Sequence, residues 1–111
     1  MNTTAKGSRF ALLVKNAAIA HNLPGVVKVR ASGHMGRRGG VPADVLIGDW
    51  RIECKDYARG VGSGLCEEIL LGDQGVHAVA HKRTRGKLVM VTVGLDDYLD
   101  LLAKATGVVV E

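Results

Sequence analysis

Residues 41–55 constrain the fold of this chain more than any other stretch, because two short β-type runs are joined here by very few residues. Val45, Leu46 and Ile47 form an aliphatic run, and the glycine and aspartate that follow are typical of a tight turn. From Arg51 onward, polar and apolar residues alternate as they do in a strand with one buried face. The sequence therefore predicts a β-hairpin.

The predicted hairpin carries two carboxylates and a lysine, Asp44, Glu53 and Lys55, at the spacing Asp-x8-Glu-x-Lys. Side chains of a strand alternate between its faces, so Glu53 and Lys55 share one face and their apolar neighbours share the other. Folding back of the hairpin can bring Asp44 beside Glu53. Such a pair suits Mg²⁺, which is held by one or two carboxylates with water and substrate phosphates, and a lysine can orient water or offset phosphate charge. The alternative is an amphipathic hairpin with a solvated charged face.

Basic residues are concentrated ahead of the hairpin. The net charge is +4, yet no acidic residue precedes Asp44, whereas seven lysines and arginines do. This part therefore carries +7 and the remainder carries −3. A basic half joined to an acid-containing site favours a polyanion such as nucleic acid held near a metal centre. Accidental clustering on a solvated face is the alternative.

Hydrophobic periodicity predicts the other elements. Helices are expected over residues 4–22 and 65–71, and strands over 26–30, 76–80 and 88–93, with the basic stretch 81–87 as the turn between the last two strands. A last helix ends before the glycine at 107. Its stripe of Leu95, Tyr98, Leu99 and Leu102 is expected to be buried.

Length and composition limit the class of protein. A chain of 111 residues with 47% hydrophobic content indicates one domain, residues 1–111, with a real core. No apolar run approaches the roughly 20 residues of a membrane helix, and the N-terminus lacks a signal-peptide pattern, so we expect a cytoplasmic protein with no membrane partner. Cys54 and Cys66 lack metal-binding spacing, which indicates reduced thiols.

The Pro-Ala-Asp at residues 42–44 and the Glu-Cys-Lys at 53–55 resemble the PD-(D/E)xK signature of metal-dependent nucleases. Within that superfamily, the chain resembles the archaeal-type Holliday junction resolvases and their small phage relatives. The Lys-Gly-Ser at residues 6–8 is similar to the family's entry to its first helix, and the Arg-Ala-Ser-Gly at 30–33 is similar to its segment before the active site. Beyond residue 55 the similarity is topological.

The resemblance implies an α/β fold with a restriction-endonuclease-like core, a mixed five-stranded β-sheet flanked by helices in the order α-β-β-β-α-β-β-α. It implies an endonuclease that uses Mg²⁺, with Mn²⁺ as the alternative metal, and that resolves branched DNA at four-way junctions by paired symmetric nicks. Each chain carries one candidate site, so paired nicks predict a homodimer, with the aliphatic residues of the 76–93 hairpin and the last helix as candidate contacts. Phage members would act in the cytoplasm of a host cell.

The resemblance also assigns roles to residues of the site. Asp44 and Glu53 would be metal ligands together with the backbone carbonyl of Cys54, and Lys55 would be the catalytic lysine. Ser32 would position water or phosphate, although a loop hydroxyl is otherwise a turn former.

Contacts with the DNA backbone are expected from basic residues at the start of the first helix, in the glycine-rich segment before the hairpin, and in the turn between the last two strands. These residues are Lys6, Arg9, Arg30, Arg37, Arg38, Lys82, Arg83 and Arg85. A flexible connection and a solubilising charged turn are the alternatives for the latter two segments.

The chain departs from the family at Ala11, where the family usually has a glutamate on the first helix that reaches toward the metal. Either the two hairpin carboxylates, a backbone carbonyl and water hold the metal, which we prefer, or Glu67 or Glu68 supplies the missing group. Three functions stay open: a junction resolvase, a repair or restriction-type nuclease of the same superfamily, and a non-catalytic DNA-binding protein that keeps the fold.

Overall fold

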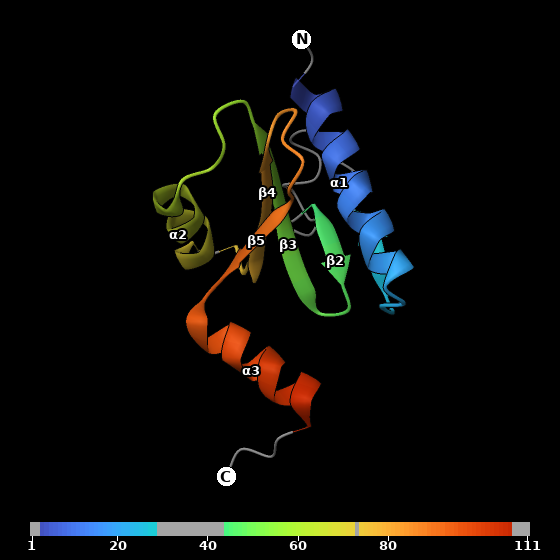
Figure 1. Cartoon of the computed structure of the whole chain (residues 1–111). Coiled ribbons are helices and arrows are strands. Elements are labelled where there is room, and N and C mark those ends of the chain that lie inside the picture. Colours follow the sequence, from blue (N-terminus) through green and yellow to red (C-terminus); the bar gives the residue numbers. More distant parts are fainter. Residues whose placement is uncertain (1–2, 29–43, 73, 108–111) are drawn as a thin grey trace.

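A computed structural model describes residues 3–28, 44–72 and 74–107. Its elements follow one another as α1 (Thr3–Ala20), β1 (Val26–Lys28), β2 (Val45–Ile47), β3 (Trp50–Tyr57), α2 (Ser63–Leu71), β4 (Ala78–Arg83), β5 (Met90–Val93) and α3 (Leu95–Thr106) (Figure 1). This is the predicted order of helices and strands. None of the described helices combines the length and apolarity needed to cross a membrane.

The five strands form one mixed sheet in the order β1-β2-β3-β4-β5. Strands β3 and β4 run parallel, and every other neighbouring pair is antiparallel. The predicted hairpin is confirmed as β2 and β3, with Val45 opposite Ile52 and Gly48 in the left-handed region at φ 60°. Strand β4 continues to Arg83, so the basic turn begins later than the sequence predicted.

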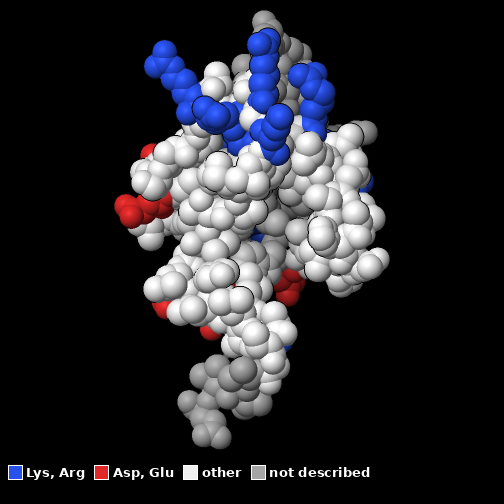
Figure 2. All heavy atoms as spheres, in the orientation of Figure 1, with Lys and Arg blue, Asp and Glu red and all other residues white. Residues whose placement is uncertain are grey.

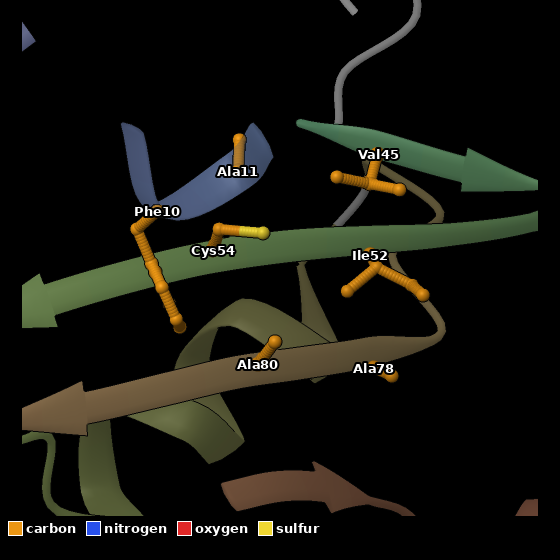
Figure 3. Close-up of a cluster of buried hydrophobic side chains, with 7 residues drawn as sticks. All are labelled: Phe10, Ala11, Val45, Ile52, Cys54, Ala78 and Ala80. Atoms are coloured by element: carbon orange, nitrogen blue, oxygen red, sulfur yellow. The ribbon is translucent and has the colours of Figure 1, made fainter. Parts of the chain in front are cut away.

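Helix α1 covers one face of the sheet through small side chains. Phe10 and Ala11 pack beside Cys54 in a cluster that has almost no exposed surface (Figure 3). The other members are Val45, Ile52, Ala78 and Ala80. Because alanine and cysteine extend little from the backbone, they let the helix approach the sheet closely. The apolar residues of β3 therefore point toward α1.

Helix α2 lies on the opposite side of the sheet, against β4 (Figure 1). Val79 alternates with Ala78 and Ala80 along β4, so it points to the α2 side, where it is fully buried. Cys66 of α2 is 1% exposed. Both cysteines are free and buried.

The prediction for the last helix is wrong in one respect. Helix α3 forms where expected and ends at Gly107, which has a left-handed conformation, but none of its residues is buried. The predicted buried stripe is exposed, with Leu95 at 69%, Leu99 at 49% and Leu102 at 40%. Figure 1 shows α3 beyond the end of the sheet, where neither α1 nor α2 reaches it. Helical spacing shows which residues share a face, but it does not show that the chain has a surface to cover that face.

Candidate functional site

The β2–β3 hairpin places Asp44 against the segment that bears Glu53. The backbone N–H of Asp44 donates to the carbonyl of Ile52 at 3.0 Å, which extends the ladder by one residue before β2 begins. The side chain then turns back, and its Oδ2 accepts a hydrogen bond from the N–H of Cys54 at 2.8 Å. The carbonyl of Cys54 points to the same edge of β3 as its N–H. Two carboxylates and one carbonyl are therefore directed to one region.

Glu53 is the most perturbed carboxyl group of this region. The pKa of Glu53 is raised from 4.5 to about 8, mainly because burial disfavours the charged form, and also by a side-chain hydrogen bond with Asp44 and by the negative charge of Asp44. The positive charge of Lys55 opposes this increase. At neutral pH the carboxyl group therefore holds a proton in the protein alone. A divalent cation would replace that proton and offset the repulsion between the two carboxylates, so this pair of oxygen donors fits Mg²⁺ or Mn²⁺.

Lys55 lies on the same face of β3 as Glu53, as strand alternation predicted. Its Nζ atom is 6.0 Å from the ring centroid of Tyr57, the last residue of β3. In the register of the parallel pair, Lys55 is opposite His81 and Tyr57 is opposite Arg83. The lysine is therefore close to the end of the sheet from which the β4–β5 turn extends.

Glu53 also lines a pocket of about 220 Å³ on the α2 side of the sheet. The other lining residues are Leu65, Glu68, Ile69, Gly72, Gln74 and Val76. Both Glu67 and Glu68 are exposed on α2, but only Glu68 lines this pocket. Among the described residues, no three His, Cys, Asp or Glu side chains lie close enough to hold one metal ion. The described carboxylate site is a pair, Asp44 and Glu53.

The position of Ala11 explains why a carboxylate is missing there. Ala11 is 3% exposed and packs among Phe10 and Cys54 on the α1 face. Glu53 precedes Cys54 on β3, but its side chain points to the opposite face of the sheet, toward α2. A carboxylate at position 11 would be buried among apolar side chains, away from the Asp44–Glu53 pair.

Basic side chains gather at one end of the molecule. In Figure 2 the lysine and arginine side chains gather at the end where Figure 1 places the start of α1 and the β4–β5 turn, while acidic side chains lie away from it. Arg83 and Arg85 are exposed, and Lys82 is half-buried. Arg85 has a left-handed backbone at φ 67°, within a turn closed by a 2.7 Å hydrogen bond from the N–H of Gly86 to the carbonyl of Arg83.

The basic turn is attached to the end of β3 by two hydrogen bonds from one residue. The N–H of Thr84 donates to the carbonyl of Tyr57 at 3.0 Å, and its hydroxyl donates to Oδ1 of Asp56 at 2.8 Å. Because Asp56 directly follows Lys55, these bonds fix the turn relative to the catalytic candidate. Arg83 and Arg85 are thereby held on the same end of the molecule as Lys55.

Several candidate residues cannot be placed. Ser32, Arg30, Arg37 and Arg38 lie outside the described residues. Lys6 belongs to the first turns of α1, but its side chain is outside the described part, whereas Arg9 is exposed on that helix.

Comparisons of the chain with protein-family models, with curated proteins and with solved structures give no match. The geometry and the sequence resemblance are therefore the grounds on which a function can be proposed.

His81 is a site neighbour that sequence reasoning missed, because it was expected in the exposed basic turn. It is 7% exposed within β4 and lies on the same face as Lys55 of the neighbouring strand. Its Nε2 is 2.9 Å from the hydroxyl of Thr92, and its buried Nδ1 has no hydrogen-bond partner among the described residues. The residues before it, Ala78, Val79 and Ala80, are all apolar and give no alternation that would extend the strand to residue 81.

Proposed function

We propose that this protein is a metal-dependent DNA endonuclease that acts in the cytoplasm on branched DNA, with four-way junctions as its leading substrate. The observation that carries the proposal is the Asp44–Glu53 pair, in which a half-buried carboxyl group with a pKa raised to about 8 interacts with a second carboxylate. Metal-free carboxylates in this arrangement favour a proton between them, and a divalent cation replaces it. The basic end supports a phosphate-rich substrate.

Each residue of the site would have a separate role in phosphodiester hydrolysis. Asp44 and Glu53 would hold Mg²⁺, or Mn²⁺ as the alternative, with water and a phosphate oxygen as the remaining ligands. When bound, such an ion activates water and offsets charge on the scissile phosphate. Lys55, on the same face, would offset further charge on that phosphate or orient the water. Arg83 and Arg85 would hold the backbone of the DNA at the same end of the sheet.

The choice of a branched substrate is supported by the resemblance to archaeal-type junction resolvases in residues 6–55. Resolution of a four-way junction takes two symmetric nicks, and each chain carries one Asp44–Glu53 pair. The proposal therefore includes a homodimer with two sites. A repair or restriction-type nuclease would use the same site on a different DNA.

The test compares a four-way junction, a flap and a plain duplex of matched sequence in one cleavage assay, with Mg²⁺, Mn²⁺, Ca²⁺ or a chelator. We expect paired nicks in the junction with Mg²⁺ or Mn²⁺ and none with the chelator. Faster cleavage of the flap or the duplex would show that the junction is not the preferred substrate. No cleavage of any DNA would refute the proposed nuclease activity.

A non-catalytic DNA-binding protein that keeps the fold is the second candidate. It is favoured by the absence of a third carboxylate beside Asp44 and Glu53 among the described residues and by the burial of Ala11 in the core. This candidate predicts tight, salt-dependent junction binding without cleavage in either metal. The same assay, read by both binding and cleavage, separates the two functions.

A further inference from the structure

The pocket between α2 and the sheet, here called the α2 pocket, shares a wall with the carboxylate pair and has no role in the proposed hydrolysis. Leu65, Glu68 and Ile69 line it from one face of α2, at the spacing that brings helical residues together. The lining residues from β3 and from the segment before β4 are Glu53, Gln74 and Val76. The α2 pocket is therefore built on the two elements that also hold the Asp44–Glu53 pair in place.

The α2 pocket has an apolar interior and a polar mouth. Val76 is 7% exposed, and Leu65 and Ile69 are half-buried, so aliphatic side chains form the interior. Glu68 and Gln74 line the same space but are exposed, which places them at the mouth. Apolar walls with a few polar groups are typical of sites that enclose an organic group and fix its orientation.

The size of the α2 pocket suits one nucleobase. A water molecule takes up about 30 Å³ of the liquid, so a volume of about 220 Å³ holds roughly seven water molecules. A base is a flat group of about ten non-hydrogen atoms whose short covalent bonds make it more compact than the same number of waters, so it fits this space. A whole nucleotide, which is about twice as large as its base, does not fit.

The charges of the α2 pocket favour a base over the other parts of a nucleic acid. Among the described lining residues none is basic and two are glutamates, so the pocket repels a phosphate. An ionised carboxylate only accepts hydrogen bonds, and the amino group of cytosine is a donor that glutamate recognises in DNA. Thymine has a carbonyl oxygen in place of that amino group, so it would set two acceptors against each other. The pocket is therefore complementary to a base that carries an amino group.

We propose that the α2 pocket holds one unstacked base of the DNA strand that is cleaved, and that Glu68 selects a base with an amino group. The inference rests on the proposed function, because it takes the scissile phosphate to lie at Asp44 and Glu53. Glu53 belongs both to the carboxylate pair and to the lining of the pocket, and a base is separated from its own phosphate by one sugar ring. A base in the α2 pocket therefore belongs to a nucleotide next to the cut.

A branched DNA is the substrate that gives up a base most readily. Stacking is interrupted where the arms of a four-way junction meet, and extrusion of a base costs least where it is already poorly stacked or unpaired. The aliphatic interior would cover the faces of the extruded base, and Glu68 would accept a hydrogen bond from its amino group. The α2 pocket would thus give the enzyme a preference for sequence at the branch point.

The first test compares cleavage rates within each protein, so that a partly unfolded variant does not mimic the result. Junctions with a fixed branch point carry cytosine, 5-methylcytosine or thymine at each position beside the mapped cut, one position at a time. At one of these positions we expect the wild type to cleave both amino-bearing junctions about tenfold faster than the thymine junction. Glu68→Gln should lower this ratio to about two or less, because an amide can also donate to the thymine carbonyl.

Glu67→Gln is the matched control, because Glu67 is exposed on α2 and does not line the pocket, so this variant should keep the wild-type ratio. Since 5-methylcytosine has the methyl group of thymine and the amino group of cytosine, it separates recognition of the amino group from an effect of size. Equal rates on the three junctions with the wild type, or the same ratio in Glu68→Gln and Glu67→Gln, would overturn the proposal.

The second test detects the extruded base without cleavage. A junction with the fluorescent base pyrrolocytosine beside the cut is saturated with protein in Ca²⁺, and its emission rises when this base leaves the stack. We expect a rise with the wild type and with Leu71→Trp, because Leu71 is 79% exposed on α2 and does not line the pocket. Ile69→Trp should abolish the rise, because its indole ring fills the pocket.

No rise with the wild type, or an equal rise in the two tryptophan variants, would overturn the pocket as a base site. A rise with a protein that cleaves no DNA in Mg²⁺ would refute only the proposed function. Cleavage at equal rates on all junctions, with no rise, would refute only the base site.

Discussion

The β2–β3 hairpin and helix α3 were both predicted from the spacing of their apolar residues. In the structure, the apolar face of the hairpin is buried and the apolar face of α3 is exposed. In the hairpin, alternation correctly separates buried Cys54, at 7% exposure, from Glu53 on the other face. In α3, helical spacing correctly groups Leu95 with Leu99, but both are exposed. The hairpin lies in the middle of a sheet with a helix on each side, whereas α3 lies past the end of the sheet (Figure 1). Periodicity identifies a face, and topology determines whether that face is covered.

The largest expected effect concerns the β2–β3 hairpin, where substitutions should lower the rate of DNA cleavage. Asp44→Asn, Glu53→Gln and Lys55→Ala should each reduce junction cleavage by about 100-fold or more while junction affinity changes little. In the proposed function these groups would serve the metal and the water, whereas affinity would come from basic contacts with phosphates. Single-turnover cleavage and a gel-shift titration measure the two quantities.

Glu67→Gln is the matched control for these variants, because Glu67 is an exposed carboxylate of α2 that does not line the pocket. It should cleave at the wild-type rate. Wild-type cleavage by Asp44→Asn at saturating Mg²⁺ would show that the hairpin carboxylates are structural and that the two regions do not differ in function.

The next largest effect compares the same new charge in the two regions. Ala11→Glu should destabilise the protein by about 3 kcal/mol or more, because it buries an unpaired carboxylate in the α1 core. Leu99→Glu should leave the free energy of unfolding of the monomer nearly unchanged, because α3 contributes no buried side chain. Urea denaturation at low protein concentration measures both. Faster junction cleavage by Ala11→Glu without loss of stability would contradict the placement of Ala11.

Stability should depend on pH through Glu53 in the metal-free protein. The pKa of Glu53 is raised to about 8 by burial and by Asp44, whereas the unfolded chain ionises near 4.5. Between these values the folded protein holds a proton that the unfolded chain has released, so stability falls as pH rises through this range and levels off above it. Glu53→Gln should remove this component, a difference of a few degrees in melting temperature. Identical pH profiles of the two proteins in a chelator would contradict the raised pKa.

The smallest effect concerns the basic end. Arg85 has a left-handed backbone that costs about 1 kcal/mol relative to glycine, so Arg85→Gly should not lower stability. It should nonetheless weaken DNA binding several-fold and reduce the slope of log affinity against log salt by about one. Lys104→Gln on α3 is the control and should leave the slope unchanged. An unaltered slope in Arg85→Gly would remove the turn from the DNA contact.

Much of the candidate site was predictable because its information is local. The turn residues Gly48 and Asp49 set the hairpin, and strand alternation then places Glu53 and Lys55 on one face. The raised pKa of Glu53 was not predictable, since it depends on burial by α2 and on the side-chain hydrogen bond with Asp44. The same applies to Ala11, whose burial follows from how α1 crosses the sheet.

The limits of sequence reasoning lie where an element ends or has no neighbour. His81 was expected in a turn, because the basic run that follows it conceals the end of β4. The exposure of Tyr98 and Leu102 could not be read from the stripe, because a covered helix and an uncovered one share the same apolar spacing. Long-range packing decides both cases.

The central claim is that Asp44 and Glu53 bind one divalent cation, and counting that cation tests it most directly. Electron paramagnetic resonance of free Mn²⁺, titrated into the full chain, should show one bound ion per chain. Asp44→Asn and Glu53→Gln should each weaken that binding at least about tenfold, and Glu67→Gln should bind as the wild type does. Equal Mn²⁺ binding by the wild type and by both hairpin variants would contradict the account.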